Sequence, residues 1–306
     1  MRMPGRSFTG LLPPLTPEES TLSARLRTHV TALAETIGDR NIWRPDALEQ
    51  AARYIEQSLR DAGHTPAAQI YVVGKQSVRN IDVDLPGTSK PHEILVVGAH
   101  YDSVPGCPAA NDNASGVAAL LEIARGLHGQ QSARTIRLVA FVNEEPPFFQ
   151  TEDMGSLVYA RRCRQRNENV IGMLSLETIG YYSDEKGSQQ YPFPLNLFYP
   201  GTGNFIAFVG NLRSKDFVHD CVRSFREHTS FPSEGAAPPE LTSELGWSDH
   251  WSFWQTGYPA LMVTDTAPFR YSHYHRPTDT PDKLDYDRTA RVTSGLLRTI
   301  QDLARS

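Results

Sequence analysis

Short apolar runs alternate with helix-like patterns along most of the chain. Six runs read as strands: Ile70–Val73, Ile94–Ala99, Ile136–Val142, Ile171–Leu176, Phe205–Val209 and Ala260–Val263. Four helices are expected between or after them: Ser115–Leu127, Met154–Arg164, Asp216–His228 and Lys283–Ala304. Strands that are apolar on both faces must be covered on both faces. We therefore predict an α/β fold, a three-layer sandwich in which a mostly parallel mixed central sheet has helices on both faces.

The N-terminal part of the chain predicts two further helices. Thr16-Pro17-Glu18-Glu19 is a capping box with proline at the first helical position, which is typical of a helix start. Apolar residues then recur at helical spacing as far as Ile37, and Gly38 ends the pattern. A second helix is expected from Pro45 to Gly63.

The composition favours one domain. No compositional shift marks a linker, so we expect a single domain over residues 1–306, with residues 1–43 as an N-terminal helical extension. Two irregular stretches, 181–203 and 230–246, are rich in Gly, Pro, Ser and aromatic residues. Loops this long in a compact domain are usually functional or mobile, so we expect both beside an active site.

Charge and cysteine content exclude several classes of protein. The chain has 30 Lys plus Arg against 35 Asp plus Glu, a formal net charge of −5, whereas nucleic-acid binding needs a dense basic surface. Its three cysteines, Cys107, Cys163 and Cys221, are too few for a disulfide framework and too far apart for a cysteine-based zinc site. We expect no nucleic-acid partner and a reducing compartment.

Membrane association is not indicated either. The apolar runs are far shorter than the roughly 20 residues that a membrane-spanning helix needs. No apolar segment follows the basic N-terminus, as a secretory signal peptide would require. We expect a cytoplasmic protein without a membrane partner, while secretion of a processed form is left open.

Residues of one chemical kind follow the predicted strands. Four strands are each followed by a histidine or a carboxylate: His100 with Asp102, Glu144 with Glu145, Glu177, and His275. In open α/β sheets, ligands bind beyond the carboxyl ends of the strands. Imidazole and carboxylate are the ligands of catalytic zinc sites. The sequence therefore predicts a metal site at the C-terminal ends of the strands.

Three details add to this prediction. Asp112 begins an expected helix, and its two oxygens could each bind one metal ion. In the Glu144-Glu145 pair, one carboxylate could bind metal while the other acts as general base on a metal-bound water. Asp102 could orient the ring of His100. Each has a plain structural alternative, such as a helix cap at Asp112, but their joint occurrence favours a metal site.

These residues fall into motifs that resemble a known family. The motifs are His100-Tyr101-Asp102-Ser103 with Ala110–Gly116, Asn143-Glu144-Glu145, Leu176-Glu177-Thr178-Ile179-Gly180, Ser248-Asp249-His250, and Tyr274-His275 through Asp279-Thr280. Together they resemble the co-catalytic two-zinc exopeptidases. This group includes bacterial leucyl aminopeptidases, aminopeptidase Y, glutamate carboxypeptidase II and the glutaminyl cyclases. The resemblance runs from about Ala47 to the C-terminus.

The resemblance implies two zinc ions (Zn²⁺) per chain. Five residues would bind them: His100, Asp112, Glu145, Glu177 and His275. Asp112 would bridge the two ions, with His100 and Glu177 on one side. Many members have Asp where this chain has Glu177, so a single bound zinc is an alternative. A cis peptide bond between Asp112 and Asn113 is also implied.

The resemblance further implies roles for five neighbours. Glu144 would be the general base, and Tyr274 or a backbone donor would stabilise the oxyanion. Three more carboxylates would support the ligands: Asp102 at His100, Asp279 near His275, and Asp249.

The activity implied is that of a zinc aminopeptidase acting on a peptide or small amide. A metal-bridging hydroxide would attack the N-terminal amide bond, with Glu144 accepting its proton. Two alternatives stay open: a glutaminyl-cyclase-like acyltransferase with one zinc, or a carboxypeptidase, dipeptidase or other amide hydrolase with Arg213 or Arg270 binding a carboxylate. Aromatic residues in 181–203 and around Ser248 are interpreted mainly as packing, with an apolar substrate pocket as the alternative.

Overall fold

The computed structural model describes residues 3–191, 195–239 and 243–305. Within them the chain forms one mixed sheet of eight strands in the order β1-β2-β4-β3-β5-β8-β6-β7. The strands are β1 (Ala67–Val73), β2 (Gln76–Leu85), β3 (Lys90–His100), β4 (Arg134–Phe141), β5 (Asn169–Glu177), β6 (Ile206–Gly210), β7 (Ser233–Ala236) and β8 (Ala260–Thr264).

The centre of the sheet is parallel. β4, β3, β5 and β8 run parallel to one another, whereas β1 with β2, β2 with β4, and β6 with β8 pair antiparallel. β7 pairs parallel with β6 at one edge. The predicted mostly parallel mixed sheet is therefore confirmed.

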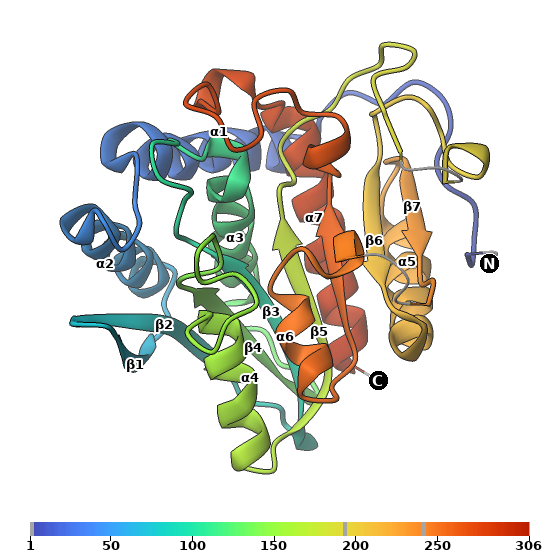
Figure 1. Ribbon diagram of the computed structural model, residues 1–306. Helices are drawn as coiled ribbons and strands as arrows, with labels where there is room; N and C mark the ends of the chain where they lie inside the picture. Colours follow the sequence, from blue (N-terminus) through green and yellow to red (C-terminus); the bar gives the residue numbers. More distant parts are fainter. Residues whose placement is uncertain (1–2, 192–194, 240–242, 306) are drawn as a thin grey trace.

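Helices cover both faces of this sheet (Figure 1). The helices are α1 (Pro17–Thr31), α2 (Pro45–Asp61), α3 (Gly116–Leu127), α4 (Gly155–Gln165), α5 (Lys215–His228), α6 (His250–Gln255) and α7 (Tyr286–Arg305). The larger core lies between the sheet and α1, α2, α3, α5 and α7, and the smaller core lies under α4 and α6. Because strand side chains alternate, Leu95 and Val97 of β3 enter the larger core while Ile94 and Val96 enter the smaller one.

The N-terminal helix is packed into this body. α1 contacts α3 and α7, and a short π-helical stretch, Ala32–Ile37, follows it. The capping box at Thr16 is present, with the Thr16 side chain accepting from the Glu19 amide. None of the helices among the described residues is long and apolar enough to cross a membrane.

Two strands were not predicted. β2 alternates Ile81, Val83 and Leu85 with Asp82 and Asp84, a period-two signal that the sequence does carry. β7 lies inside the stretch 230–246, which is predicted to be irregular throughout. Its sequence, Ser-Glu-Gly-Ala, has little strand propensity. As an edge strand, β7 pairs only with β6 among the described strands.

The last helix also starts later than predicted. A short 3-10 turn covers Pro281–Lys283, and α7 begins at Tyr286 rather than at Lys283. The physical reason is a cap, since the Asp285 carboxylate accepts a hydrogen bond from the Arg288 amide at 3.0 Å.

Candidate metal centre

The candidate site lies where the parallel strands end. β3 ends at His100 and β5 ends at Glu177, while Glu144 and Glu145 follow β4 by a few residues. His275 comes from the loop after β8. Since these strands are parallel neighbours, their carboxyl ends meet at one edge of the sheet.

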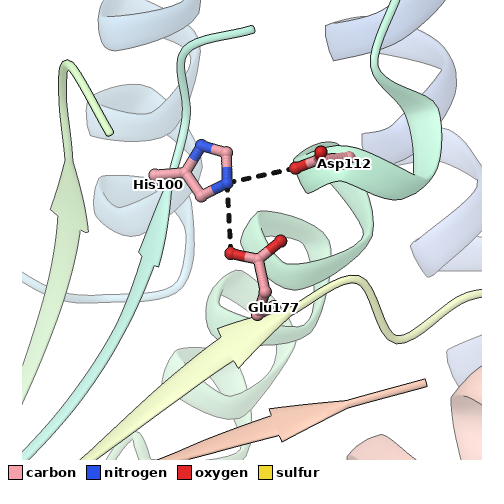
Figure 2. Close-up of side chains that lie close together, drawn as sticks. All are labelled: His100, Asp112 and Glu177. Carbon is pink, nitrogen blue, oxygen red and sulfur yellow. Dashed lines mark ion pairs between the residues drawn. The ribbon is translucent and has the colours of Figure 1, made fainter. Parts of the chain in front are cut away.

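The predicted ligands form two groups that share Asp112. His100 Nε2 lies 3.2 Å from Asp112 Oδ1 and 3.2 Å from Glu177 Oε2 (Figure 2). On the other side, His275 Nε2 lies 2.9 Å from Asp112 Oδ2 and 3.3 Å from Glu145 Oε2. The two oxygens of Asp112 therefore face two different histidines. This is the arrangement of a carboxylate that bridges two cations.

The donor set fits divalent metal ions. Four-coordinate zinc, with bonds of about 2.0–2.1 Å, sets its ligand atoms about 3.3 Å apart, close to the spacing within each group. Both ring nitrogens of His100 and Oε1 of Glu145 are buried without a hydrogen-bond partner among the described residues. Buried polar atoms without partners are costly, and a cation bound to the first group would satisfy His100 Nε2, whereas Nδ1 faces Asp102 instead.

The electrostatics point the same way. Burial raises the pKa of Glu145 to about 7 and that of Glu177 to about 7, and the nearby Asp112 charge adds to both shifts. Burial, followed by the charges of Glu145 and Glu177, also raises the pKa of Glu144 well above its ordinary value. So many carboxylates in one buried place repel one another, and a divalent cation would relieve the repulsion.

Asp102, which follows β3, forms hydrogen bonds to the segment that follows β4. Its carboxylate accepts hydrogen bonds from the backbone amides of Glu144, at 3.1 Å, and Glu145, at 3.2 Å. Its Oδ1 lies 3.6 Å from His100 Nδ1, longer than a hydrogen bond. Asp102 therefore stands beside the His100 ring, as predicted, but its hydrogen bonds hold the segment after β4.

Asp279 supports a different ligand from the one predicted. Its carboxylate accepts from the backbone amides of Asn111, at 2.9 Å, and Asp112, at 3.1 Å, and from Tyr271 Oη at 2.8 Å. No hydrogen bond joins it to the ring of His275 in the described part of the chain. Asp279 therefore fixes the backbone that carries Asp112.

Glu144, Tyr274 and Asp249 complete the predicted set. Glu144 Oε2 lies 3.9 Å from His100 Nε2. The Tyr274 ring stacks on His275, with centroids 3.9 Å apart. Asp249 is fully buried, and neither of its carboxylate oxygens has a hydrogen-bond partner among the described residues. Burial raises the pKa of Asp249 to about 7.

The backbone around the site is unusual. The peptide bond between Asp112 and Asn113 is cis, as the resemblance implied. Four residues at the site have left-handed backbone without being glycine: Ala109, Asn143, Thr178 and His275, with φ between 48° and 58°. Such conformations tend to gather at functional sites, where the surrounding structure holds them.

Sequence reasoning missed Arg40. This residue is fully buried, and its guanidinium donates to the carbonyls of Tyr101 at 2.7 Å, Pro108 at 2.7 Å and Ala109 at 2.9 Å. It therefore joins the segment after β3 to the loop that leads to Asp112. A lone arginine between Asp39 and Asn41 carries no signal for this role, which depends on contacts between segments far apart in sequence.

A cavity of about 530 Å³ adjoins the site. Glu177 and Tyr274 line one part of it, and Tyr191, Tyr199 and Trp247 line others. Tyr191, Tyr199 and Trp247 are therefore pocket residues, as the alternative interpretation held, whereas Tyr182, Phe253 and Trp254 pack in the cores, as the main interpretation held. Phe193, from the same aromatic group, lies outside the described residues.

Neither candidate arginine lines the cavity beside the candidate metal centre. Arg270 is buried; its Nε donates to Gln189 Oε1 at 2.7 Å and its Nη1 to the carbonyls of Gly203 and Phe205, while its Nη2 has no hydrogen-bond partner among the described residues. Arg213 is exposed, and it is not among the residues that line the cavity. The carboxypeptidase alternative thus finds no arginine among the described residues that line the cavity.

An α/β sheet with a histidine–carboxylate cluster at its carboxyl edge is an arrangement suited to metal-dependent hydrolysis. The family model "Peptidase family M28" matches residues 80–300. The chain is 36% identical over 293 residues to the protein YfbL of Escherichia coli K12, covering 93% of this chain and 89% of YfbL. The chain belongs to peptidase family M28, a family of metallopeptidases.

More distant comparisons agree. A probable zinc metalloprotease of Pyrenophora teres is 28% identical over 260 residues, which cover 75% of this chain and 52% of that protein; the chain thus spans about half the length of this fungal relative. The zinc aminopeptidase BSAP of Bacillus subtilis shares the fold, with a TM-score of 0.74 and 17% identity over 93% of this chain and 95% of BSAP. So does a glutaminyl cyclase of Fimbriiglobus ruber, with a TM-score of 0.68 and 21% identity over 96% of this chain and 97% of that one.

Proposed function

We propose that this chain is a zinc aminopeptidase that hydrolyses the N-terminal amide bond of peptides. The observation that carries the proposal is the pair of three-residue groups sharing Asp112, set directly beside an apolar cavity. One group consists of His100, Asp112 and Glu177, and the other of Asp112, Glu145 and His275. Each group would hold one zinc ion. Zinc bound there would lower the pKa of a water molecule and polarise the substrate carbonyl.

The remaining chemistry is assigned to two side chains. Glu144 is a buried carboxylate that clusters with His100 of one group and Glu145 of the other, so it takes the proton of the attacking water and passes it to the leaving amine. Tyr274 lines the cavity beside His275, and its hydroxyl donates to the carbonyl oxygen as negative charge develops there. The cavity holds the side chain of the N-terminal residue.

A serine hydrolase mechanism has no support in the geometry. Ser248 Oγ donates to Glu177 Oε2 at 2.8 Å, and His250 Nε2 bonds to the carbonyl of Leu245 at 2.7 Å. Ser248 and His250 are thus each engaged elsewhere. Ser248 is better assigned to orienting Glu177.

The test combines metal analysis with a substrate panel. The purified protein is expected to contain two zinc ions per chain and to hydrolyse aminoacyl-p-nitroanilides. A chelator should abolish this hydrolysis and added zinc should restore it. Glu144→Gln should keep its zinc but lose about 10²–10⁴-fold in kcat. Glu185→Gln, an exposed change of the same kind, should match the wild type.

Three results would contradict the proposal. Hydrolysis that survives thorough chelation would exclude the metal mechanism. Near-normal kcat in Glu144→Gln would exclude this residue as the base. Cyclisation of an N-terminal glutaminyl peptide with one zinc and no p-nitroanilide hydrolysis would establish the acyltransferase alternative.

A further inference from the structure

The floor of the cavity is a row of residues that crosses four strands. Glu177 of β5 pairs with Thr264 of β8, Thr264 pairs with Ala207 of β6, and Ala207 pairs with Glu234 of β7. All four line the cavity. Neighbouring strands lie about 4.7–4.9 Å apart, so three steps place Glu234 about 14 Å from Glu177 along the sheet. The cavity therefore runs from the candidate metal centre towards Glu234.

The walls along this row are mainly apolar. Six large apolar or aromatic residues contribute: Tyr191, Leu195, Tyr199, Trp247, Met262 and Phe269. The Tyr199 hydroxyl donates to the carbonyl of Gly235 at 3.3 Å, so the segment that carries Tyr199 lies against β7 next to Glu234. A long, apolar body of a substrate would pack well between these walls.

Glu234 is a carboxylate without a partner in these walls. It is half-buried, and within the described ranges its side chain makes neither an ion pair nor a hydrogen bond. Arg226 is a nearby cation, but its guanidinium is held by Ser233 and the carbonyl of Pro4. Ser233 and Glu234 are consecutive in β7, so their side chains point to opposite faces of the strand. Arg226 therefore makes its hydrogen bonds on the face opposite Glu234.

Two tyrosines stand close to this carboxylate. Burial raises the pKa of Tyr191 and of Tyr199, and the negative charge of Glu234 adds to both shifts, whereas the positive charge of Arg270 acts to lower the pKa of Tyr191. Their rings lie 5.9 Å apart at 34°. A carboxylate beside aromatic faces is suited to a guanidinium or ammonium group, which gains a charge-assisted hydrogen bond and a cation–π contact together.

We propose that this cavity selects substrates whose N-terminal residue is arginine or lysine, and that Glu234 is the residue that recognises the basic group. The inference rests on the proposed aminopeptidase function. The aliphatic stem of either side chain packs along the apolar walls, and its charged end pairs with Glu234. A neutral side chain of the same length leaves this half-buried carboxylate unpaired and is disfavoured.

The discriminating experiment compares arginine with citrulline, its neutral isostere. The ratio of kcat/KM for arginyl- over citrullinyl-p-nitroanilide is expected to be at least about 10 in the wild type, as a charge-assisted hydrogen bond implies. Glu234→Gln should bring this ratio close to one. Glu227→Gln, an exposed substitution on α5, should leave it unchanged. Circular dichroism of each variant checks that it is folded.

A binding measurement keeps the inference separate from the proposed function. Calorimetry with arginine amide and citrulline amide on the Glu144→Gln background should give the same preference, and adding Glu234→Gln should remove it. Arginine preference in binding without any p-nitroanilide hydrolysis would overturn the aminopeptidase function and uphold the recognition by Glu234. A ratio near one in the wild type, or a ratio that survives Glu234→Gln, would overturn the inference.

Discussion

At the scale of single residues, Arg40 links the N-terminal segment to the candidate metal centre. Besides three carbonyls near the ligands, it donates to the carbonyls of Leu33 and Gly38. Burial lowers its pKa, whereas the negative charges of Asp102 and Asp279 act to raise it. A buried cation that is hydrogen-bonded throughout holds its partners in place, and here the partners carry His100 and Asp112.

Arg40→Met should therefore weaken metal binding as well as the fold. The variant leaves several buried carbonyls unsatisfied, at about 1–3 kcal/mol for each one left without water. We expect zinc affinity, measured by competition with a chelator, to fall at least 10-fold, and the melting temperature of the zinc-free protein to fall too. Arg53→Met, at an exposed arginine of α2, serves as control. Unchanged zinc affinity in Arg40→Met would show that its contacts do not position the ligands.

At the scale of elements, a buried carboxylate joins α1 to α3. Glu122 of α3 is 4% exposed, and it accepts from Arg25 Nε at 2.6 Å and lies 3.2 Å from His29 Nε2, both on α1. Arg125, one turn further along α3, donates to the same carboxylate. α3 begins just after the segment that carries Asp112. The contact between Glu122 and α1 therefore stabilises the helix that follows this ligand.

Glu122→Gln should destabilise the protein in a pH-dependent way. Burial alone would raise the pKa of Glu122, but the hydrogen bonds from His29 and Arg25 lower it. A carboxylate with a lowered folded pKa stabilises above its unfolded pKa of about 4.3, and the effect is lost as the pH falls through the folded value. Urea unfolding at pH 7 should show a loss of about 1–3 kcal/mol.

That difference between wild type and Glu122→Gln should shrink as the pH falls below about 4.3. Glu18→Gln, at an exposed glutamate of α1, controls for the loss of a charge. A difference that stays constant from pH 7 down to pH 3 would mean that the Glu122 ion pairs are not its source.

At the scale of the whole molecule, the candidate ligands join parts of the chain that are far apart in sequence. The ends of β3 and β5, the segments after β4 and before α3, and the loop after β8 meet at this site. A ligand that binds the folded but not the unfolded chain stabilises it by about 4 kcal/mol when present at 1,000 times its Kd.

Removing zinc should therefore lower the melting temperature. For a chain of this size we expect a drop of about 5–15 °C on treatment with a chelator, with recovery on adding zinc but not magnesium. Differential scanning calorimetry measures this directly, and Glu145→Gln should show a smaller drop, because one ligand is missing. Identical melting curves with and without chelator would argue against a metal ion that ties these segments together.

The sequence predicted those parts of the fold that depend on local pattern. The central strands and most helices follow from apolar runs and amphipathic periods, because burial on both faces of a sheet leaves a continuous apolar run. The family motifs also named five side chains that the structure brings together. β7 was missed because Ser233–Ala236 is stabilised by pairing with β6 rather than by its own propensity.

The sequence by itself therefore determined the α/β architecture, the family and the residues that can bind metal, since each depends on residue type and local spacing. Only the tertiary structure decided which oxygen of Asp112 faces which histidine, and that Asp279 holds the Asp112 backbone. It also decided that Arg40 spans two loops and that Glu234 lies in register with Glu177 across three strand spacings. These relations join residues far apart along the chain, and a sheet's strand order and register arise from the whole packed molecule rather than from any local pattern.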